Sequence, residues 1–491
     1  MSEDAAPEHP NPEGGPAVPK APPRSLKRLA IRGSVWTFAG YGISQVLRLG
    51  GNLILTRLLF PEAFGVMALV NVFLTGLAMF SDLGLSPSIV QSPRGEDADF
   101  LRTAWTIQVM RGAVLWLGAL AISLPAASFY DEPALARFLP IAGFTLFIAG
   151  LESTNFLLLQ RHLNVMIQTA LDIGVQLVSL LVSIMGTLVW RGAIEQRNLE
   201  RVLRVLFEGQ VLADEAVGTS YLWGGIWALI IGTLVGRALR MFVTFSLPGP
   251  RMGLSLRKEH VHELIHFGKW IFLASILTFF VNSSDRPVLA KFMDPAQLGV
   301  YSIGMNFPNV VQGVLYGIAG RVLFPVYAEL ARERPEHLRS RMIRVRFSLA
   351  CVTLPILWVM VVLGPQLIDF LYDDRYREAG VFMQVLAGGT IVIVLMNPIE
   401  AIFLSVGNSR GHCVMLISRS VLFVVSMAVG GYFYGAYGIV WGVAIGPALN
   451  YPFLVLLTRK YGAWTPLFDA ACVSVSAVVI ILGLWIKISI M

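Results

Sequence analysis

Long apolar runs constrain this sequence more than any other feature. Blocks of about 20 or more mostly apolar residues recur along its 491 residues, and about 20 residues are needed for a helix to cross a bilayer. Only 14% of the residues are charged and the mean hydropathy is +0.67, so soluble domains of this length would lack a charged surface. The pattern predicts an all-α polytopic membrane protein. It argues against a soluble enzyme, a disulfide-rich secreted protein and a nucleic-acid-binding protein.

The first 32 residues differ from the rest of the chain. They are rich in proline and carry several acidic residues, so we expect a disordered tail. No apolar stretch of a secretory signal follows the N-terminus. A cluster of basic residues, Arg24, Lys27, Arg28 and Arg32, directly precedes the first apolar run and predicts a cytoplasmic N-terminus. We therefore expect a multi-pass membrane protein with its N-terminus in the cytoplasm.

Hydropathy predicts about 13 spans. They lie near residues 33–58, 64–91, 103–125, 138–159, 166–190, 222–246, 267–290, 297–324, 346–371, 381–406, 413–434, 437–458 and 468–490. Loops assigned to the cytoplasm are richer in Lys and Arg than the opposite loops, in agreement with the tail. An odd number of spans would leave the C-terminus outside.

One predicted outer segment, residues 191–221, is long and polar. Leu199, Val202, Leu203 and Leu206 fall on one helical face, so we expect a short amphipathic helix at the membrane surface. The same segment is a candidate docking surface for a partner.

An internal repeat relates the first and seventh spans. Pro61 and Pro295 are 295 − 61 = 234 residues apart, and at this ungapped offset WTFAGYGISQVLRLGGNLILTRLLFPEAFGV aligns with WIFLASILTFFVNSSDRPVLAKFMDPAQLGV. Matches include Trp36 with Trp270 and Gly65 with Gly299. The repeat predicts two six-helix lobes of parallel topology and one extra C-terminal helix, an arrangement that transporters use to rock around a central site.

Domain boundaries follow from this repeat. We expect a tail at 1–32, an N-lobe at 33–246 with 191–221 as a periplasmic insertion, an amphipathic cytoplasmic linker at 247–266, a C-lobe at 267–460 and an extra helix within 461–491.

Two stretches resemble a known family. LTRLLFPEAFGVMALVNVF followed by FSDLGLSPSIVQ, and FGKWIFLASILTFFVNSSDRPVLAKFMDPAQLGVYSIGMNF with RVLFPVYAEL, resemble the polysaccharide-transporter family of O-antigen and exopolysaccharide flippases. This family belongs to the multidrug/oligosaccharidyl-lipid/polysaccharide flippase superfamily. The resemblance covers about residues 33–460. It implies a two-lobed, V-shaped helical fold and the movement of undecaprenyl-diphosphate-linked oligosaccharides from the cytoplasmic to the periplasmic leaflet.

Charged residues within the spans are the candidate site residues. A charge at the bilayer centre costs at least about 2.5–3.5 kcal/mol, so each should face a cavity or a partner. Arg48 and Asn52 lie one turn apart, and Asn282 and Arg286 occupy the same positions in the repeat in reversed order. Each lobe would then present one guanidinium and one amide towards a central cleft. Guanidinium groups bind phosphate well, which fits a diphosphate substrate.

The remaining candidates fall into two groups. Arg57 and Lys291 would form a shallower cation pair near the outer mouth, and Arg111 is a further candidate substrate-binding residue. All these cations could instead anchor helix ends or pair with carboxylates such as Asp82 and Asp285. Candidates for coupling to protons or another ion are Asp82, Glu152, Asp172 and Glu400. The alternative for these four carboxylates is a structural ion pair.

One catalytic motif is present by pattern alone. His262, Glu263 and His266 match the H-E-x-x-H zinc protease pattern, but no third ligand or soluble catalytic domain accompanies them. We therefore expect no enzyme activity, no metal site and no cofactor. The three cysteines, Cys351, Cys413 and Cys472, give no metal-binding or disulfide spacing.

We weigh three functions. The expected one is a flippase for lipid-linked oligosaccharides whose partners are that lipid, membrane lipids and a polysaccharide polymerase or co-polymerase. The alternatives are a multidrug or cation antiporter of the same superfamily and a membrane polysaccharide polymerase or ligase.

Overall fold

The computed structural model describes residues 26–162, 164–208, 215–333, 335–461 and 464–490. Within these ranges some side chains, chiefly those of 26–35 and 192–222, are not described. Most of the tail, the Leu199, Val202, Leu203 and Leu206 side chains and the His266 side chain therefore lie outside the described part.

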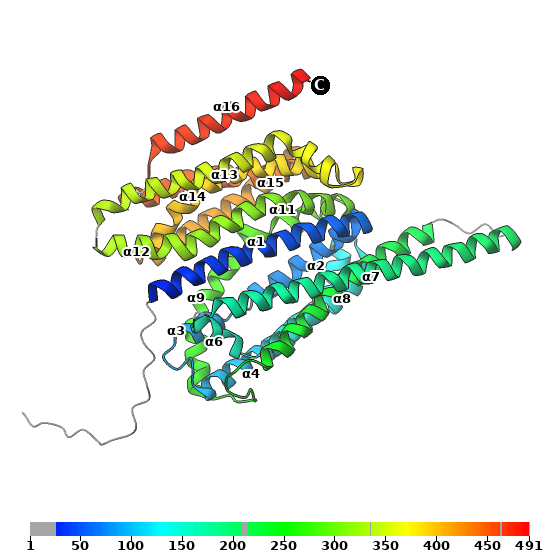
Figure 1. The fold of residues 1–491 in the computed structure, drawn as a ribbon, viewed down its shortest axis with the longest axis horizontal. Helices are drawn as coiled ribbons and strands as arrows, with labels where there is room; N and C mark the ends of the chain where they lie inside the picture. Colours follow the sequence, from blue (N-terminus) through cyan, green and yellow to red (C-terminus); the bar gives the residue numbers. More distant parts are fainter. Residues whose placement is uncertain (1–25, 163, 209–214, 334, 462–463, 491) are drawn as a thin grey trace, which may run out of the picture.

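All the regular secondary structure of the described residues is helical (Figure 1). The helices are α1 (Leu26–Leu58), α2 (Pro61–Met79), α3 (Leu85–Gln91), α4 (Ala98–Tyr130), α5 (Pro133–Leu151), α6 (Asn155–Arg161), α7 (Val165–Glu208), α8 (Glu215–Phe245), α9 (Lys258–Ser283), α10 (Asp285–Leu289), α11 (Pro295–Ile318), α12 (Phe324–Glu333), α13 (Pro335–Leu371), α14 (Ala379–Ser405), α15 (Ser409–Thr458) and α16 (Pro466–Ile490). A π-helical turn, Ala319–Leu323, joins α11 to α12, and short 3₁₀ turns occupy Asp374–Tyr376 and Arg459–Tyr461. The prediction of an all-α fold is confirmed.

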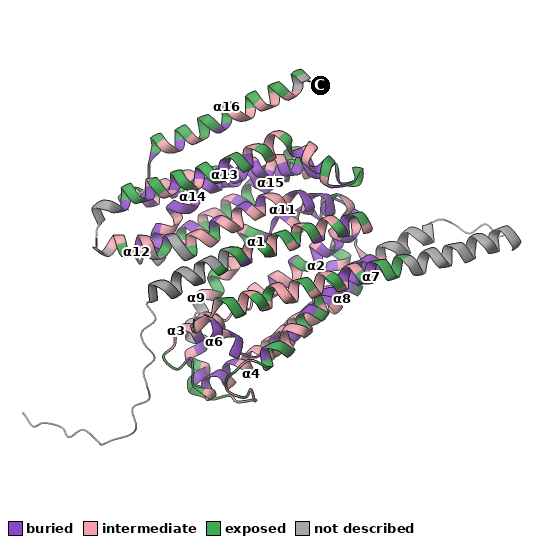
Figure 2. Cartoon of the chain, in the orientation of Figure 1, coloured by how far each residue is buried: buried purple, intermediate pink, exposed green. Residues whose placement is uncertain are grey.

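Nine of these helices, counted within the described residues, are long and apolar enough to cross a membrane. Their outward faces carry large exposed apolar side chains, for example Leu467 (87% exposed), Trp485 (65%) and Ile481 (65%) on α16. Figure 2 shows that α16 is exposed or half-buried over most of its length. Such surface is stable in lipid and unfavourable in water. The chain is therefore a multi-pass membrane protein.

Helix α15 contains two of the predicted spans. Gly435 has φ 59° and ψ −139°, a conformation that is open to glycine and strained for other residues. It breaks the helix between residues 434 and 436, where the sequence predicts a short connection between spans 413–434 and 437–458.

The segment 191–221 differs from its prediction. Helix α7 continues without a break to Glu208 and α8 begins at Glu215, so the backbone extends the spanning helices and forms no separate short helix. Helix propagation costs little once a long helix has nucleated, and 191–208 contains no proline or glycine except Gly192 near its start.

The helices pack mainly within two groups. Close pairs in the first half of the chain are α4 with α5, α7 with α8 and α1 with α7, and those in the second half are α13 with α14, α14 with α15 and α11 with α14. The groups meet along α2 and α11 (Figure 1). Helix α9 does not keep to one group, since it contacts α2, α3 and α4 as well as α15.

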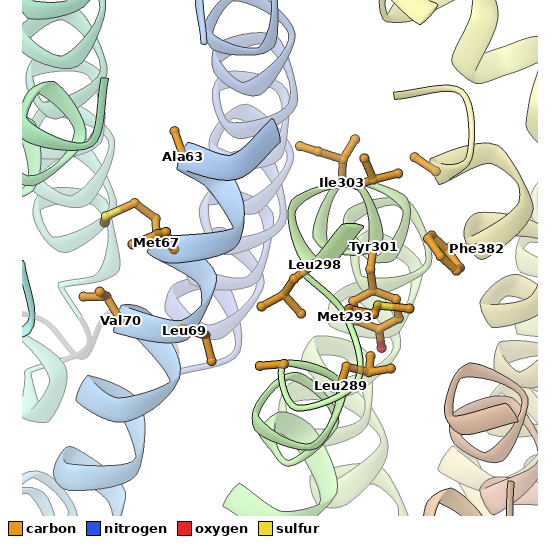
Figure 3. Packing of buried hydrophobic residues seen from close by; sticks show 14 of the residues in the cluster. Ala63, Met67, Leu69, Val70, Leu289, Met293, Leu298, Tyr301, Ile303 and Phe382 are labelled. Atoms are coloured by element: carbon orange, nitrogen blue, oxygen red, sulfur yellow. The ribbon is translucent and has the colours of Figure 1, made fainter. Parts of the chain in front are cut away.

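The main hydrophobic core joins the two groups. Figure 3 shows Leu69 of α2 on the side of Leu289, Leu298 and Tyr301, with Phe382 of α14 beyond them, whereas Ala63, Met67 and Val70 project from the other side of α2. All belong, with Met293 and Ile303, to one cluster. All are buried. We call this end of the molecule, where α1 ends and α2 begins, the Pro61 side, and the opposite end, where α2 ends and α6 lies, the Arg161 side.

Candidate functional site

Two polar cavities lie in the centre of the described structure. The first cavity, of about 410 Å³, is bounded by α1, α9, α10, α11, α14 and α15. Its polar lining consists of Tyr41, Gln45, Arg48, Asn282, Asp285, Asn309, Gln312, Tyr316, Thr390 and Arg419. Most of these helices belong to the second half of the chain, but Arg48 enters from α1.

The second cavity, of about 390 Å³, lies towards the first helix group. Its polar lining consists of Asn52, Asn71, Thr75, Ser183, Thr233, Ser283, Arg286, Ser302 and Asn306. It too is shared, because Arg286 comes from α10 whereas Asn52 comes from α1.

The repeat-related residues meet across the two groups. Arg48 shares the first cavity with Asn282, its equivalent at offset 234, and Asn52 shares the second cavity with its equivalent Arg286. The sequence predicts one central cleft into which each lobe points an Arg and an Asn. In the structure α1 and the α9–α10 segment instead divide these four residues between two cavities, one guanidinium and one amide in each.

Neither guanidinium is used to hold the fold together. Within the described residues, Arg48 and Arg286 form no hydrogen bond and no ion pair with another side chain. Asp285, the carboxylate next to Arg286, accepts a hydrogen bond from Tyr301 Oη at 2.6 Å instead. Both cations therefore remain free to bind an anionic group.

The second predicted cation pair lies elsewhere. Lys291 Nζ donates to the Phe129 carbonyl at 2.6 Å and lies 3.4 Å from Asp131 Oδ2, at the end of α4 on the Pro61 side. Arg57 is exposed on the same side. Neither residue lines the two cavities.

Contacts from the second half of the chain close the Pro61 side around the end of α1. Arg375 donates to the carbonyls of Thr56 (3.3 Å) and Leu59 (3.5 Å), and Tyr376 Oη also donates to Leu59 at 3.3 Å. Cations at a helix C-terminus are favoured by its dipole. Sequence reasoning missed Arg375, which lies in a short connection with no repeat equivalent among the cations.

Arg111 and Asp82 both make hydrogen bonds near the end of α2. Arg111 donates to Ser81 Oγ (2.9 Å) and to the Ala78 carbonyl (2.6 Å), so it caps the end of α2 and does not line either cavity. Asp82 accepts from the Gly84 amide (2.9 Å) and from Ser275 Oγ of α9 (2.9 Å).

Three other carboxylates are ion-paired. Arg240 lies 3.0 Å from Glu152 and 2.7 Å from Asp172, and Arg237 lies 3.5 Å from Glu152. Glu400 lies 3.4 Å from Arg419, which lines the first cavity. Of the four coupling candidates, Glu400 is the one whose partner faces a cavity.

The H-E-x-x-H segment lies at the start of α9. Glu263 accepts from Ser92 Oγ at 2.8 Å and lies 3.8 Å from Arg94, while Leu264 is buried against Leu85 and Phe100. Within the described residues there is no cluster of three metal-ligating side chains.

The fold and site together define a polytopic helical membrane protein with cation-bearing polar cavities between two helix groups. Residues 54–194 and 202–381 match the family described as polysaccharide biosynthesis protein, so the chain belongs to that family.

Similar proteins agree with this family. The chain is 21% identical over 431 residues to the lipopolysaccharide biosynthesis protein WzxC of Escherichia coli K12, covering 87% of this chain and 80% of WzxC. It is 20% identical over 336 residues to the succinoglycan biosynthesis transport protein ExoT of Rhizobium meliloti, covering 68% and 60% of the two chains. The lipid II flippase MurJ, in an inward closed conformation, superposes with a TM-score of 0.69 at 14% identity, covering 94% and 93%. MurJ thus shares the fold.

Proposed function

We propose that this protein is a flippase that moves undecaprenyl-diphosphate-linked oligosaccharide units from the cytoplasmic to the periplasmic leaflet of a bacterial inner membrane. The observation that carries the proposal is the placement of Arg48 with Asn282 and of Arg286 with Asn52 in two cavities between the helix groups. Guanidinium groups bind phosphate oxygens strongly even when partly desolvated. Amide and hydroxyl groups around them suit the hydroxyls of sugars.

Transport would proceed by alternating access. The Pro61 side is closed by the α2–α11 contact and by Arg375 and Lys291, so the substrate head would enter from the Arg161 side. With the N-terminus cytoplasmic, the Arg161 side faces the cytoplasm and the Pro61 side the periplasm. The isoprenoid chain would stay in the lipid while the diphosphate-sugar head crosses within the protein.

Coupling to an ion would use one of the candidate carboxylates. Glu152 and Asp172 are paired with Arg240, and Asp82 is hydrogen-bonded between α2 and α9, so these three have structural partners away from the cavities. Glu400 is the strongest coupling candidate because its partner Arg419 faces the substrate space. For residues 191–221 we propose a docking role for a polymerase or co-polymerase.

The relatives support the substrate class. WzxC is named for lipopolysaccharide biosynthesis, ExoT for transport in succinoglycan biosynthesis, and MurJ for flipping lipid II. The first two names place relatives of this chain in polysaccharide biosynthesis, and the third is that of a lipid flippase with the same fold. A multidrug antiporter would need acidic residues to dominate its site, whereas each cavity presents a guanidinium that has no ionic partner among the described side chains.

Complementation of a flippase-null strain tests the proposal. We expect Arg48→Ala and Arg286→Ala to abolish polymer export while the protein remains in the membrane at wild-type amounts. Arg344→Ala serves as the matched control, since Arg344 is an exposed arginine near the start of α13. Normal export by both cavity variants would contradict the proposal.

A further inference from the structure

The first cavity contains a second guanidinium that the repeat does not predict. Arg419 of α15 lines this cavity together with Arg48 of α1, so the two cations approach one space from different helix groups. The residue at offset 234 from Arg419 is Met185, which explains why the repeat gives no signal for it. A diphosphate carries oxygens on two phosphorus atoms and suits two guanidinium groups better than one.

Arg419 is held by two partners whose contacts differ in quality. Its Nη2 donates to Tyr316 Oη at 2.7 Å, a normal hydrogen bond. Its Nη1 lies 3.4 Å from both carboxylate oxygens of Glu400, well beyond the usual 2.7–2.9 Å of a charge-assisted bond. Both side chains of this pair are largely buried, at 14% and 15% exposed. The ion pair is thus largely buried but loosely made.

We propose that the substrate diphosphate binds between Arg48 and Arg419, and that it draws Arg419 away from Glu400, which then takes up a proton. This inference rests on the proposed function and names the group that couples it to protons. A buried carboxylate that loses its counter-ion is costly as an anion and is neutralised by protonation. Substrate binding and proton uptake would then occur together.

The charges balance in this step. Arg419 keeps its positive charge and exchanges the Glu400 carboxylate for a phosphate oxygen. Glu400 gains one proton from water at one carboxylate oxygen and becomes neutral. Among the described side chains, the titratable or charged groups that face Glu400 are Arg419 and His412 of α15 and Tyr316 of α11. Release of the diphosphate would return Arg419 to Glu400, and Glu400 would give its proton back to water.

Calorimetric titration of the full-length protein in lipid nanodiscs with inorganic pyrophosphate tests the inference. Titrations in buffers of different ionisation enthalpy give the number of protons taken up. We expect wild type to take up about one proton more per bound pyrophosphate than Glu400→Gln does, since the difference removes the proton changes of pyrophosphate itself. Arg419→Gln should bind roughly 10- to 100-fold more weakly, the loss of one charge-assisted hydrogen-bonding group, and Arg419→Lys should bind more tightly than Arg419→Gln.

Glu152→Gln is the matched control, because the Glu152 side chain is 13% exposed, similar to that of Glu400, and is also paired with arginine, but does not line the first cavity. It should keep the wild-type proton uptake. Equal uptake by wild type and Glu400→Gln, or wild-type affinity in Arg419→Gln, would overturn the inference. The proposed function would survive either of these results, provided that wild type binds pyrophosphate and that Arg48→Ala weakens this binding. A wild-type protein that binds no pyrophosphate contradicts both.

Discussion

Gly65 and Gly299, which the repeat makes equivalent, lie at the crossing of α2 and α11, and each faces the carbonyl of the proline that begins the other helix. A Cβ on Gly65 would overlap the Pro295 oxygen, and a Cβ on Gly299 would overlap the Pro61 oxygen. The contact is therefore reciprocal, as expected where a two-fold axis passes between equivalent elements. Both glycines are buried at the Pro61 side.

Alanine at either glycine should open or destabilise the Pro61 side. The added methyl meets rigid backbone, and overpacking of this kind costs about 1–3 kcal/mol. Thr75→Cys places a reporter thiol in the second cavity, after Cys351, Cys413 and Cys472 are replaced by serine. We expect this thiol to react several-fold faster with an impermeant maleimide applied from the Pro61 side when either glycine is alanine.

Gly317→Ala on α11 is the control for these variants, since a Cβ there meets open space. It should leave the labelling rate of the Thr75→Cys reporter unchanged. Unchanged labelling in both Gly65→Ala and Gly299→Ala would refute a closing role for the contact between α2 and α11.

Lys291 and Arg375 should together stabilise the closed state of the Pro61 side. Each ties the second half of the chain to the end of a helix in the first half, Lys291 to α4 and Arg375 to α1. Exposed cation contacts of this kind contribute about 0–1 kcal/mol each, so single alanine variants should change the labelling of the Thr75→Cys reporter about fivefold or less. The double variant should raise it further. If the reporter thiol of the double variant is labelled at the same rate as in the protein that retains Lys291 and Arg375, these two cations do not hold the closed state.

The pairing of Arg48 with Asn282 in one cavity allows a position-swap test. Arg48→Asn should reduce export at least about tenfold, because a charge-assisted contact to phosphate is lost. Adding Asn282→Arg returns a guanidinium to the same cavity from the opposite helix group and should restore much of the export. Asn306→Arg, which places the cation in the second cavity, should not rescue Arg48→Asn. Equal export by the two double variants would contradict the assignment of Arg48 to the first cavity.

Much of the helical layout was predictable because hydropathy and helix length are properties of local sequence. The spans 413–434 and 437–458 are an example, since Gly435 between them provides the break. That Arg48 and Arg286 line cavities was predictable, because an ionised group within an apolar span needs a cavity or a partner and the repeat relates their positions.

Other features depend on tertiary contacts that periodicity does not contain. The division of Arg48, Asn52, Asn282 and Arg286 between two cavities depends on tertiary arrangement: α1 packs on α7, and its Arg48 and Asn52 reach cavities that α9, α10 and α11 also line. Lys291 and Arg111 bind carbonyls at helix ends. The partner of Lys291 is Phe129 and that of Arg111 is Ala78, and each partner is distant in sequence from its cation. The helical course of 191–208 shows how helix propagation can extend a spanning helix where the sequence suggests a separate one.

The extra helix α16 should be held by one buried ion pair. Arg346 of α13 pairs with Asp469 of α16, also donates to Thr465 Oγ1 and lies over the Phe468 ring, while Tyr451 donates to Asp469 at 2.5 Å. Removing one partner of a buried pair costs about 3–5 kcal/mol, so Asp469→Ala should lower the free energy of unfolding by that order. Ser489→Ala should have little effect, because Ser489 is exposed on α16 and its hydroxyl donates to the Trp485 carbonyl of the same helix. Thermal unfolding in detergent measures both, and equal stability of the two variants would contradict this role.

The central claim, that the diphosphate head crosses through the cavities holding Arg48 and Arg286, is tested most directly in vesicles of purified protein. The measurement is the rate at which a fluorescently labelled polyprenyl-diphosphate oligosaccharide moves from the inner to the outer leaflet, followed by an impermeant quencher. We predict rapid movement with wild type and at least a tenfold slower rate with the Arg48→Ala, Arg286→Ala double variant at equal protein density. Equal rates in wild-type and double-variant vesicles would contradict the account.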